Sequence, residues 1–140
     1  MMTIIAKYKF NQSTYADLLP VFNNKFTDYT ITDEIDTDGY TIRTIGNNSG
    51  NLPTLMKFGQ TYVSGEVQQD YTGCLLEVLD MNTSELTSCR DMFRYCTNLT
   101  SINCNWNTSK VTTMYGMFNN CDNLTQLDLS NFDTSQVNNM

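Results

Sequence analysis

The stretch MFNNCDNLTQLDLSNFDTSQV, residues Met117–Val137, contains three short patterns that recur along the chain. It begins with a Met-Phe pair, continues through the frame L-x-x-L-x-L at Leu124–Leu129, and ends on an Asx-Thr-Ser cluster at Asp133–Ser135. A more degenerate copy runs from Met92 to Val111. The recurrence predicts a repeat architecture, because one copy alone cannot bury all of its apolar residues and stacked neighbours can.

The L-x-x-L-x-L frame occurs three times, with conservative replacements. The three segments are Leu76–Met81, Leu99–Cys104 and Leu124–Leu129, and their starts are almost evenly spaced. This frame and this period are the signature of leucine-rich repeats, in which a short strand lines one face of a solenoid. We therefore expect one strand in each repeat of about 25 residues.

A second apolar pattern follows each strand segment. After Asn82-Thr-Ser, it places Cys89, Met92, Phe93 and Cys96 at positions i, i+3, i+4 and i+7, the spacing of one stripe of an α-helix. The next copy has the same stripe at Met114, Met117, Phe118 and Cys121. The Asx-Thr-Ser clusters would supply N-cap side chains, so each repeat is expected to be a strand, a turn and a short helix.

Residues 1–70 do not repeat in this way and are typical of a small β-rich module. Thr3–Phe10 alternates as a strand does, whereas Ser13–Phe22 has apolar residues at helical spacing. Tyr29–Ile35 and Tyr40–Ile45 flank an Asp-Thr-Asp-Gly turn, which is a β-hairpin signal. The sequence thus predicts a β-hairpin and a further strand in this part of the chain.

The expected fold class is α+β: a small β-rich N-terminal module followed by a leucine-rich-repeat solenoid with one strand and one short helix per repeat. Residues 1–70 would form an anchor or capping module, and residues 71–140 about two and a half repeats. The last repeat is incomplete, so the strand at Leu124–Leu129 would be an open edge that recruits other chains. We expect the chain to be oligomeric or part of a longer protein.

The composition excludes several classes of function. The 140 residues include 8 Lys+Arg and 15 Asp+Glu, and the net charge of −7 disfavours nucleic acid as a partner. The absence of His excludes a Ser-His-Asp or Cys-His nucleophile pair within the chain. No apolar stretch approaches the length of a membrane span, so membrane insertion is not expected, and no signal peptide is visible.

Cysteine is present at five positions: Cys74, Cys89, Cys96, Cys104 and Cys121. An odd number cannot pair completely within one chain. In the repeat alignment, Cys89 takes the place of Met114, and Cys104 that of Met81 and Leu129, which is typical of apolar packing positions. We favour buried free thiols over a disulfide or a metal site, and we expect neither a metal nor another cofactor.

The side chains between the strand leucines should face solvent on the concave side of the repeats. They form the candidate binding face, which consists of Val78, Asp80, Asn82, Ser101, Asn103, Asn105, Gln126, Asp128 and Ser130. Asp80, Asn103 and Asp128 would stack as a ladder about 4.8 Å apart. A polar face with little charge suits a glycan or a protein surface, although the simpler interpretation is that these residues only solubilise the fold.

Three other patterns have a functional and a structural interpretation. Asp33–Gly39 is similar to a calcium loop, but Ile45 would occupy the closing Glu position, so a plain hairpin turn is favoured. Six N-x-S/T sequons occur, and the four in the repeat frame are better explained as turn residues than as glycan sites. Asp80 and Asp128 could be separated like the carboxylates of an inverting glycosidase, but no general-acid environment is evident, so an enzyme is not expected.

The frame M-F-x-x-C-x-x-L-T-x-L-D-L-S-N-F-D-T-S-x-V resembles the BspA-like leucine-rich-repeat surface proteins of bacteria. It stands at Met117–Val137, recurs from Met92 to Val111, and the resemblance covers about residues 74–140. The resemblance implies a cell-surface or secreted protein associated with adhesion to host proteins or to other cells. No catalytic residues come with this family.

The expected function is therefore non-enzymatic. The N-terminal module would dock into a larger protein assembly, and the repeats would present an adhesive surface to a cell-surface protein or glycan. Because no export signal is visible, a fibre or decoration component on the surface of a phage or prophage virion is favoured. The alternative is an extracellular, bacterial cell-surface adhesin that binds a host protein or glycan.

Overall fold

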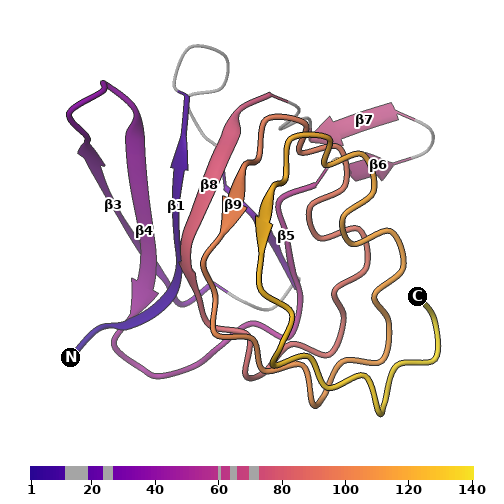
Figure 1. Cartoon of the computed structure of the whole chain (residues 1–140). Helices are drawn as coiled ribbons and strands as arrows, with labels where there is room; N and C mark the ends of the chain where they lie inside the picture. The colour runs from indigo at the N-terminus through magenta and orange to yellow at the C-terminus, as the bar shows by residue number, and fades with distance from the viewer. Residues whose placement is uncertain (12–18, 24–26, 60, 64–65, 70–72) are drawn as a thin grey trace.

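Ten strands lie in the described part of the computed structural model, which covers residues 1–11, 19–23, 27–59, 61–63, 66–69 and 73–140. The strands are β1 Thr3–Phe10, β2 Val21–Phe22, β3 Thr30–Ile35, β4 Thr41–Asn47, β5 Met56–Lys57, β6 Thr61–Val63, β7 Glu66–Gln69, β8 Leu75–Met81, β9 Ser101–Ile102 and β10 Gln126–Leu127. Six of them form one sheet in the order β10-β9-β8-β1-β4-β3 (Figure 1), and two pairs, β2-β5 and β6-β7, stand outside it. The large sheet therefore contains strands from both halves of the chain.

Strand β1 lies inside this sheet and pairs antiparallel with both β4 and β8. Ala6, Tyr8 and Phe10 are buried, and the lysines between them are half-buried, as the alternation predicts. An irregularity in the pairing with β4 just before Ala6 turns Ile5 inward as well. The expected strand is confirmed, but Ile5 packs in the core and does not share the side of the lysines.

Strands β3 and β4 form the hairpin that the sequence predicts. The Oδ1 atom of Asp36 accepts hydrogen bonds from the N–H groups of Asp38 (3.0 Å) and Tyr40 (2.9 Å). Gly39 has a φ of +84°, a left-handed conformation that glycine adopts without strain. The segment is a hairpin turn held by the carboxylate of Asp36, which agrees with the sequence-based preference for a plain turn over a calcium loop.

Strands β8, β9 and β10 are parallel, and each comes from a successive repeat. Val78 pairs with Ile102, and Ile102 pairs with Leu127, so these three residues occupy equivalent positions. The frame read from the sequence instead aligned Leu79 with Ile102. The alignment of the first repeat was therefore wrong by one position.

No helix is present in the described residues, and the helix expected at Cys89–Cys96 is replaced by consecutive tight turns. The N–H groups of Met92, Arg94 and Cys96 donate to the carbonyl oxygens three positions before them, at 3.2, 3.3 and 2.9 Å. The alternate N–H groups donate to the next repeat: Asp91 to Tyr115, Phe93 to Met117 and Tyr95 to Asn119, at 2.9, 2.9 and 2.8 Å. An N–H group engaged in this way cannot complete a helical ladder.

Left-handed residues recur at equivalent places in the two copies of this segment. Asp91 and Tyr95 have φ values of 55° and 62°, and their counterparts in the next repeat, Gly116 and Asn120, have values of 63° and 58°. A right-handed helix needs negative φ throughout. The apolar spacing arises here because side chains turn inward at similar intervals in consecutive turns.

The expected α+β fold with a leucine-rich-repeat solenoid is therefore wrong. The described chain is all-β, and its largest element is a mixed six-stranded sheet in place of separate strand and helix layers. Of the helix expected at Ser13–Phe22, residues 13–18 lie outside the described residues, and Val21–Phe22 forms β2. The described segments contain no helix with the length and apolarity needed to cross a membrane. The division into residues 1–70 and 71–140 stays a prediction.

A column of aromatic rings connects the antiparallel strands to the repeats. Tyr8 of β1 meets Phe58 edge-on, with ring centroids 5.1 Å apart. Phe58 stacks on Phe93 at 5.5 Å and 7°, and Phe93 stacks on Phe118 at 5.9 Å and 2°. Phe58 and Phe93 are fully buried, whereas Phe118 is half-buried. The column is thus continuous through one hydrophobic core.

Truncation of the central ring should be the most costly change in this column. We expect Phe93→Ala to lower the free energy of unfolding by about 3–5 kcal/mol, because a fully buried ring stacked on both sides leaves a cavity. Phe118→Ala should cost less, since one side of its ring is open. Urea unfolding followed by Trp106 fluorescence measures both, and equal midpoints for the two variants would contradict the column.

Gly116 provides a second test, with Gly50 as the matched control. Both have positive φ, so either alanine variant should lose about 1–3 kcal/mol from backbone strain. Only at Gly116 does an added Cβ lie 2.4 Å from Asp91 Oδ1, whereas nothing lies within 4 Å at Gly50. Gly116→Ala should therefore have the lower thermal midpoint. Equal midpoints would show that the repeats are not in this close contact.

Candidate binding face

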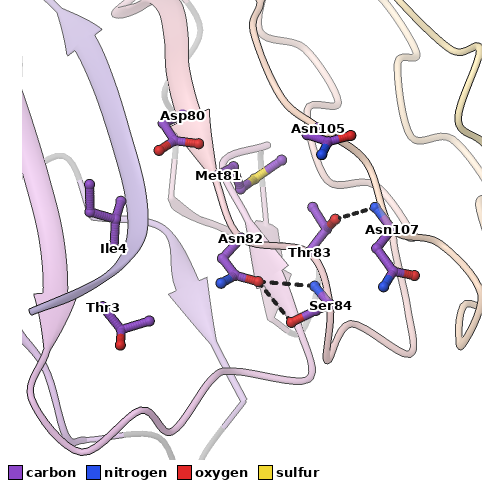
Figure 2. Close-up of a pocket in the computed structure, with 9 residues that line it drawn as sticks. All are labelled: Thr3, Ile4, Asp80, Met81, Asn82, Thr83, Ser84, Asn105 and Asn107. Carbon is purple, nitrogen blue, oxygen red and sulfur yellow. Dashed lines mark hydrogen bonds between the residues drawn. The ribbon is translucent and has the colours of Figure 1, made fainter.

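Polar side chains of β8, β9 and β10, and of the segments that follow them, surround two shallow depressions. The first, of about 520 Å³, lies over the three strands and is lined by Glu77, Val78, Leu79, Ser101, Ile102, Asn103, Gln126, Leu127 and Asp128. The second, of about 410 Å³, lies where the strands give way to turns (Figure 2) and is lined by Thr3, Ile4, Asp80, Met81, Asn82, Thr83, Ser84, Asn105 and Asn107. The sequence-predicted residues are thus divided between two sites.

Four polar residues of the predicted face come together at the first depression: Ser101, Asn103, Gln126 and Asp128. Three others line the second: Asp80, Asn82 and Asn105. Ser130 lies outside both, is exposed, and donates its N–H to Asp128 Oδ1 at 2.8 Å. Thr3 and Ile4 were missed because the sequence predicts a module that caps the repeats but does not indicate that β1 is the strand that pairs with them.

Val78 is fully buried, so its expected place on the solvent face is wrong. The cause is an irregularity in the pairing of β8 with β1, where Lys7 pairs with Asp80 but Tyr8 pairs with Val78. Leu79 is the extra residue. The same shift removes Asp80 from the expected ladder with Asn103 and Asp128, because Asp80 lines the other depression.

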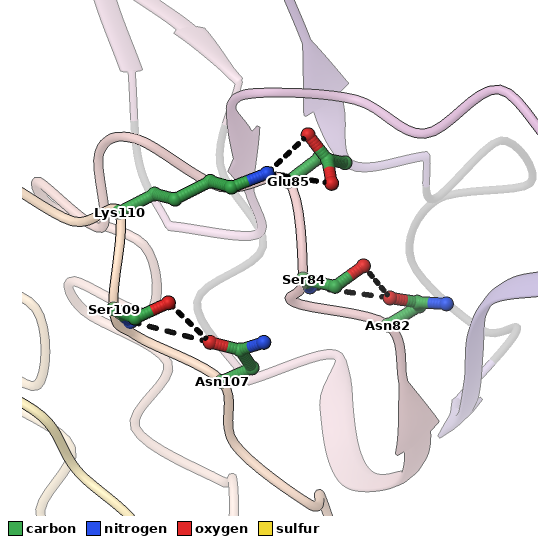
Figure 3. A network of polar contacts seen from close by, with 6 residues as sticks. All are labelled: Asn82, Ser84, Glu85, Asn107, Ser109 and Lys110. Carbon is green, nitrogen blue, oxygen red and sulfur yellow. Dashed lines mark hydrogen bonds and ion pairs between the residues drawn. The ribbon is translucent and has the colours of Figure 1, made fainter.

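The Asx-Thr-Ser clusters form turns whose residues line part of the second depression (Figure 3). Asn82 Oδ1 accepts the N–H (3.2 Å) and the hydroxyl (2.8 Å) of Ser84. Asn107 Oδ1 accepts the same two groups of Ser109, at 3.3 and 2.8 Å. These clusters were expected to cap helices, but they are Asx turns in a chain segment without a helix.

The threonine of each cluster links its repeat to the next one. Thr83 is buried, and its Oγ1 accepts the N–H of Asn107 at 2.7 Å. Thr108 is buried as well, and its Oγ1 accepts the N–H of Asp133 at 2.8 Å. On the surface nearby, Lys110 Nζ contacts Glu85 at 2.8 Å across the same gap (Figure 3), an exposed ion pair that adds little stability. The clusters are therefore structural parts of the repeats.

Three side chains at the first depression are not used by the fold. Within the described residues, the side chains of Ser101, Asn103 and Gln126 form no hydrogen bond, which leaves one hydroxyl and two amides open to a ligand. Hydrogen bonds from the hydroxyl and the N–H of Ser130 hold the pKa of Asp128 below its usual range. Asp128 is therefore a hydrogen-bond acceptor near neutral pH and not a proton donor.

An apolar depression of about 400 Å³ lies at the β10 end of the molecule. It is lined by Met114, Gly116, Met117, Phe118, Asn119, Leu129, Phe132 and Met140. Leu129 is 43% exposed, while Leu127 and Val137 are half-buried. These side chains lie partly open, as expected from the sequence. The partner or the further repeats that would cover them stay a prediction.

The five cysteines are free thiols, and they lie in or beside the core. Cys74, Cys89 and Cys96 are buried, whereas Cys104 and Cys121 are half-buried. Burial raises the pKa of the Cys89 and Cys104 thiols to about 12 and that of Cys121 to about 11. Among the described residues, no three His, Cys, Asp or Glu side chains are grouped as a metal site requires. The prediction of free thiols is confirmed, and that of burial holds for three of them.

Together, the fold and the site define an all-β protein with a polar face that is built from repeated segments. A family model described as "Mycoplasma protein of unknown function, DUF285" matches residues 66–140, more than half of the chain. The chain belongs to this family. The match contains the repeated segments and the residues, about 74–140, that resemble the BspA-like proteins. Comparison with curated proteins and with solved structures gives no match.

The raised thiol pKa values predict how stability responds to alkaline pH. An unfolded cysteine begins to ionise near its ordinary pKa of 9.0, while folded Cys104 stays protonated until about pH 12. The unfolded state thus holds fewer protons in this window, and unfolding becomes easier as pH rises from 9 toward 12. Cys104→Ala should make this fall in unfolding free energy less steep. The same slope in the variant and the wild type would contradict the assignment.

Proposed function

We propose that the protein is a non-enzymatic display protein, in which the N-terminal part docks into a larger assembly and the repeats present a binding surface. The observation that carries the proposal is the first depression on the face of β8, β9 and β10. Three polar residues lie there on backbone that is hydrogen-bonded to a neighbouring strand: Ser101, Asn103 and Gln126. Their side chains form no hydrogen bond within the described residues. A rigid backbone that carries unused polar groups is suited to recognition.

The chemistry of the face favours a polar, extended ligand. Small-molecule sites are concave and mostly apolar, whereas the two depressions here are shallow, and amides, hydroxyls and carboxylates make up about half of their lining. Glu77, Asp80 and Asp128 contribute the only formal charges at the rims of these two described sites. A glycan or a polar protein surface offers the many weak hydrogen bonds that such a lining can satisfy.

Because of the ionisation state of Asp128, we do not propose an enzymatic role. A glycosidase needs one carboxyl that stays protonated to act as general acid. The hydrogen bonds from Ser130 lower the pKa of Asp128, which works against that role. The expected partner of Asp128 in such a pair, Asp80, lines the other depression. Binding without turnover is the function that this geometry supports best.

The family match bears on where the binding surface would be displayed. The description of the family names a bacterial genus, and residues 74–140 resemble bacterial surface proteins of the BspA-like type. The genus supports a bacterial origin, and the resemblance supports display on the bacterial surface, with adhesion to a host protein or glycan as the role. Display on a phage virion is the alternative, and detection of the protein in purified virions but not on intact cells would favour it.

The binding proposal can be tested with paired amide variants. The probes are an array of mammalian-surface glycans and a panel of immobilised extracellular-matrix proteins, screened with the full chain. For any probe that binds, Asn103→Ala with Gln126→Ala should weaken binding at least about fivefold, because each amide contributes about 0.5–1.5 kcal/mol. The control pair is Gln136→Ala with Asn138→Ala, two exposed amides outside both depressions. Equal affinity for both pairs, or no bound probe, would overturn the proposal.

A further inference from the structure

We propose that the free edge of β3 is the interface between two copies of this chain, which pair antiparallel to extend the six-stranded sheet. This inference goes beyond the proposed function and does not depend on it. Strand β3 is the last strand of the sheet on the side opposite β10, and among the described strands it pairs only with β4 (Figure 1). Every residue of the strand, from Thr30 to Ile35, is exposed. An unprotected edge of this length is a template for another strand.

The apolar side chains of β3 lie on the side of the sheet that packs against the core, but the core does not extend far enough to cover them. Ile31 pairs with Ile45, and Ile45 is fully buried. Ile35 pairs with Thr41, which is buried as well. Residues opposite one another on paired strands point to the same face, so Ile31 and Ile35 lie on the core side. Yet Ile31 is 39% exposed and Ile35 59% exposed.

The charges at this edge are balanced, although the chain carries a net charge of −7. Arg43 holds Asp33 through two hydrogen bonds, Nε to Oδ1 at 2.7 Å and Nη2 to Oδ2 at 2.6 Å. Lys7 Nζ lies 3.4 Å from Glu34 Oε1. The two acidic residues within β3 are thus each matched by a base, Asp33 by Arg43 of β4 and Glu34 by Lys7 of β1. A second copy therefore brings a base with each acidic residue of its β3, which reduces the repulsion between the two edges.

The charge of Asp36, the first residue of the turn that follows β3, is also balanced by a base. Lys9 Nζ lies 2.7 Å from Asp36 Oδ2, and this contact holds the pKa of Asp36 below its usual range. The hydrogen bonds from Arg43 likewise lower the pKa of Asp33. These carboxylates remain ionised and paired near neutral pH, so the edge keeps its balance of charge.

The spacing of the side chains makes the edge complementary to itself. Ile31 and Ile35 stand two positions on either side of Asp33. A two-fold axis at Asp33 would place Ile31 of one copy opposite Ile35 of the other, twice, on the core side of the joined sheet. The two Asp33 carboxylates would meet between these pairs, each held by the Arg43 of its own copy. In the registers shifted by two positions, these pairs are lost. The backbone also fits, because two antiparallel edges supply each other with N–H and C=O groups.

Sedimentation of the full chain over about 1–100 µM, a range that covers affinities typical of modest protein interfaces, tests the pairing. We expect a reversible dimer in the wild type and at least a tenfold weaker one in Ile31→Lys with Ile35→Lys. The matched control is Leu129→Lys, an exposed leucine at the opposite end of the sheet, which should leave the dimer intact. A wild-type monomer throughout, or a dimer lost only in the Leu129 variant, would overturn the proposal.

Amide hydrogen exchange on the wild type provides a readout that requires no variant. If the edges pair, the outward N–H groups of β3 should exchange more slowly as concentration rises, while those of β10 should not change. Concentration-dependent protection at β10 without protection at β3 would assign the interface to the other edge and contradict the inference. Higher oligomers that protect both edges would contradict a closed dimer.

Discussion

Hydrogen bonds between successive repeats are the constraint on which the rest of the structure depends. The N–H groups of Asp91, Phe93 and Tyr95 donate to carbonyl oxygens of the next repeat, so they are not available within their own segment. The backbone satisfies the remaining groups by tight turns, which require left-handed conformations at Asp91 and Tyr95. Between these residues the ring of Phe93 points inward and stacks on the equivalent ring of the next repeat. The aromatic column thus follows from the pairing of the backbone.

The central position of β1 joins two kinds of architecture. On one side it pairs with the β3-β4 hairpin, and on the other with β8, the first of the parallel strands. Tyr8 carries the same connection into the core, because its ring contacts Phe58, which stacks on Phe93. The repeats and the antiparallel strands therefore share one hydrophobic core. The irregularity around Leu79 is one consequence, since β8 must fit β1 and β9 at once.

The proposed binding function depends on polar side chains that form no hydrogen bond within the described structure. Much of the Asn, Thr and Ser in the repeats is used internally: Asn82 closes a turn and Thr83 links two repeats. Asn103, which directly follows β9, and Gln126 of β10 have no such task in the described structure and are exposed. At the opposite edge the acidic residues of β3 are paired with bases, and Ile31 and Ile35 are what remains open. The two proposed surfaces therefore differ in character, one polar and one apolar.

The sequence by itself determined the period of the repeats, the β3-β4 hairpin and the apolar positions, because recurrence and turn chemistry are properties of neighbouring residues. It could not decide between a helix and consecutive turns at Cys89–Cys96, since both place side chains inward at similar intervals. Hydrogen bonds to the following repeat made that choice. The burial of Val78 was likewise decided by the pairing of β8 with β1, a contact between residues far apart in the chain that local patterns do not encode.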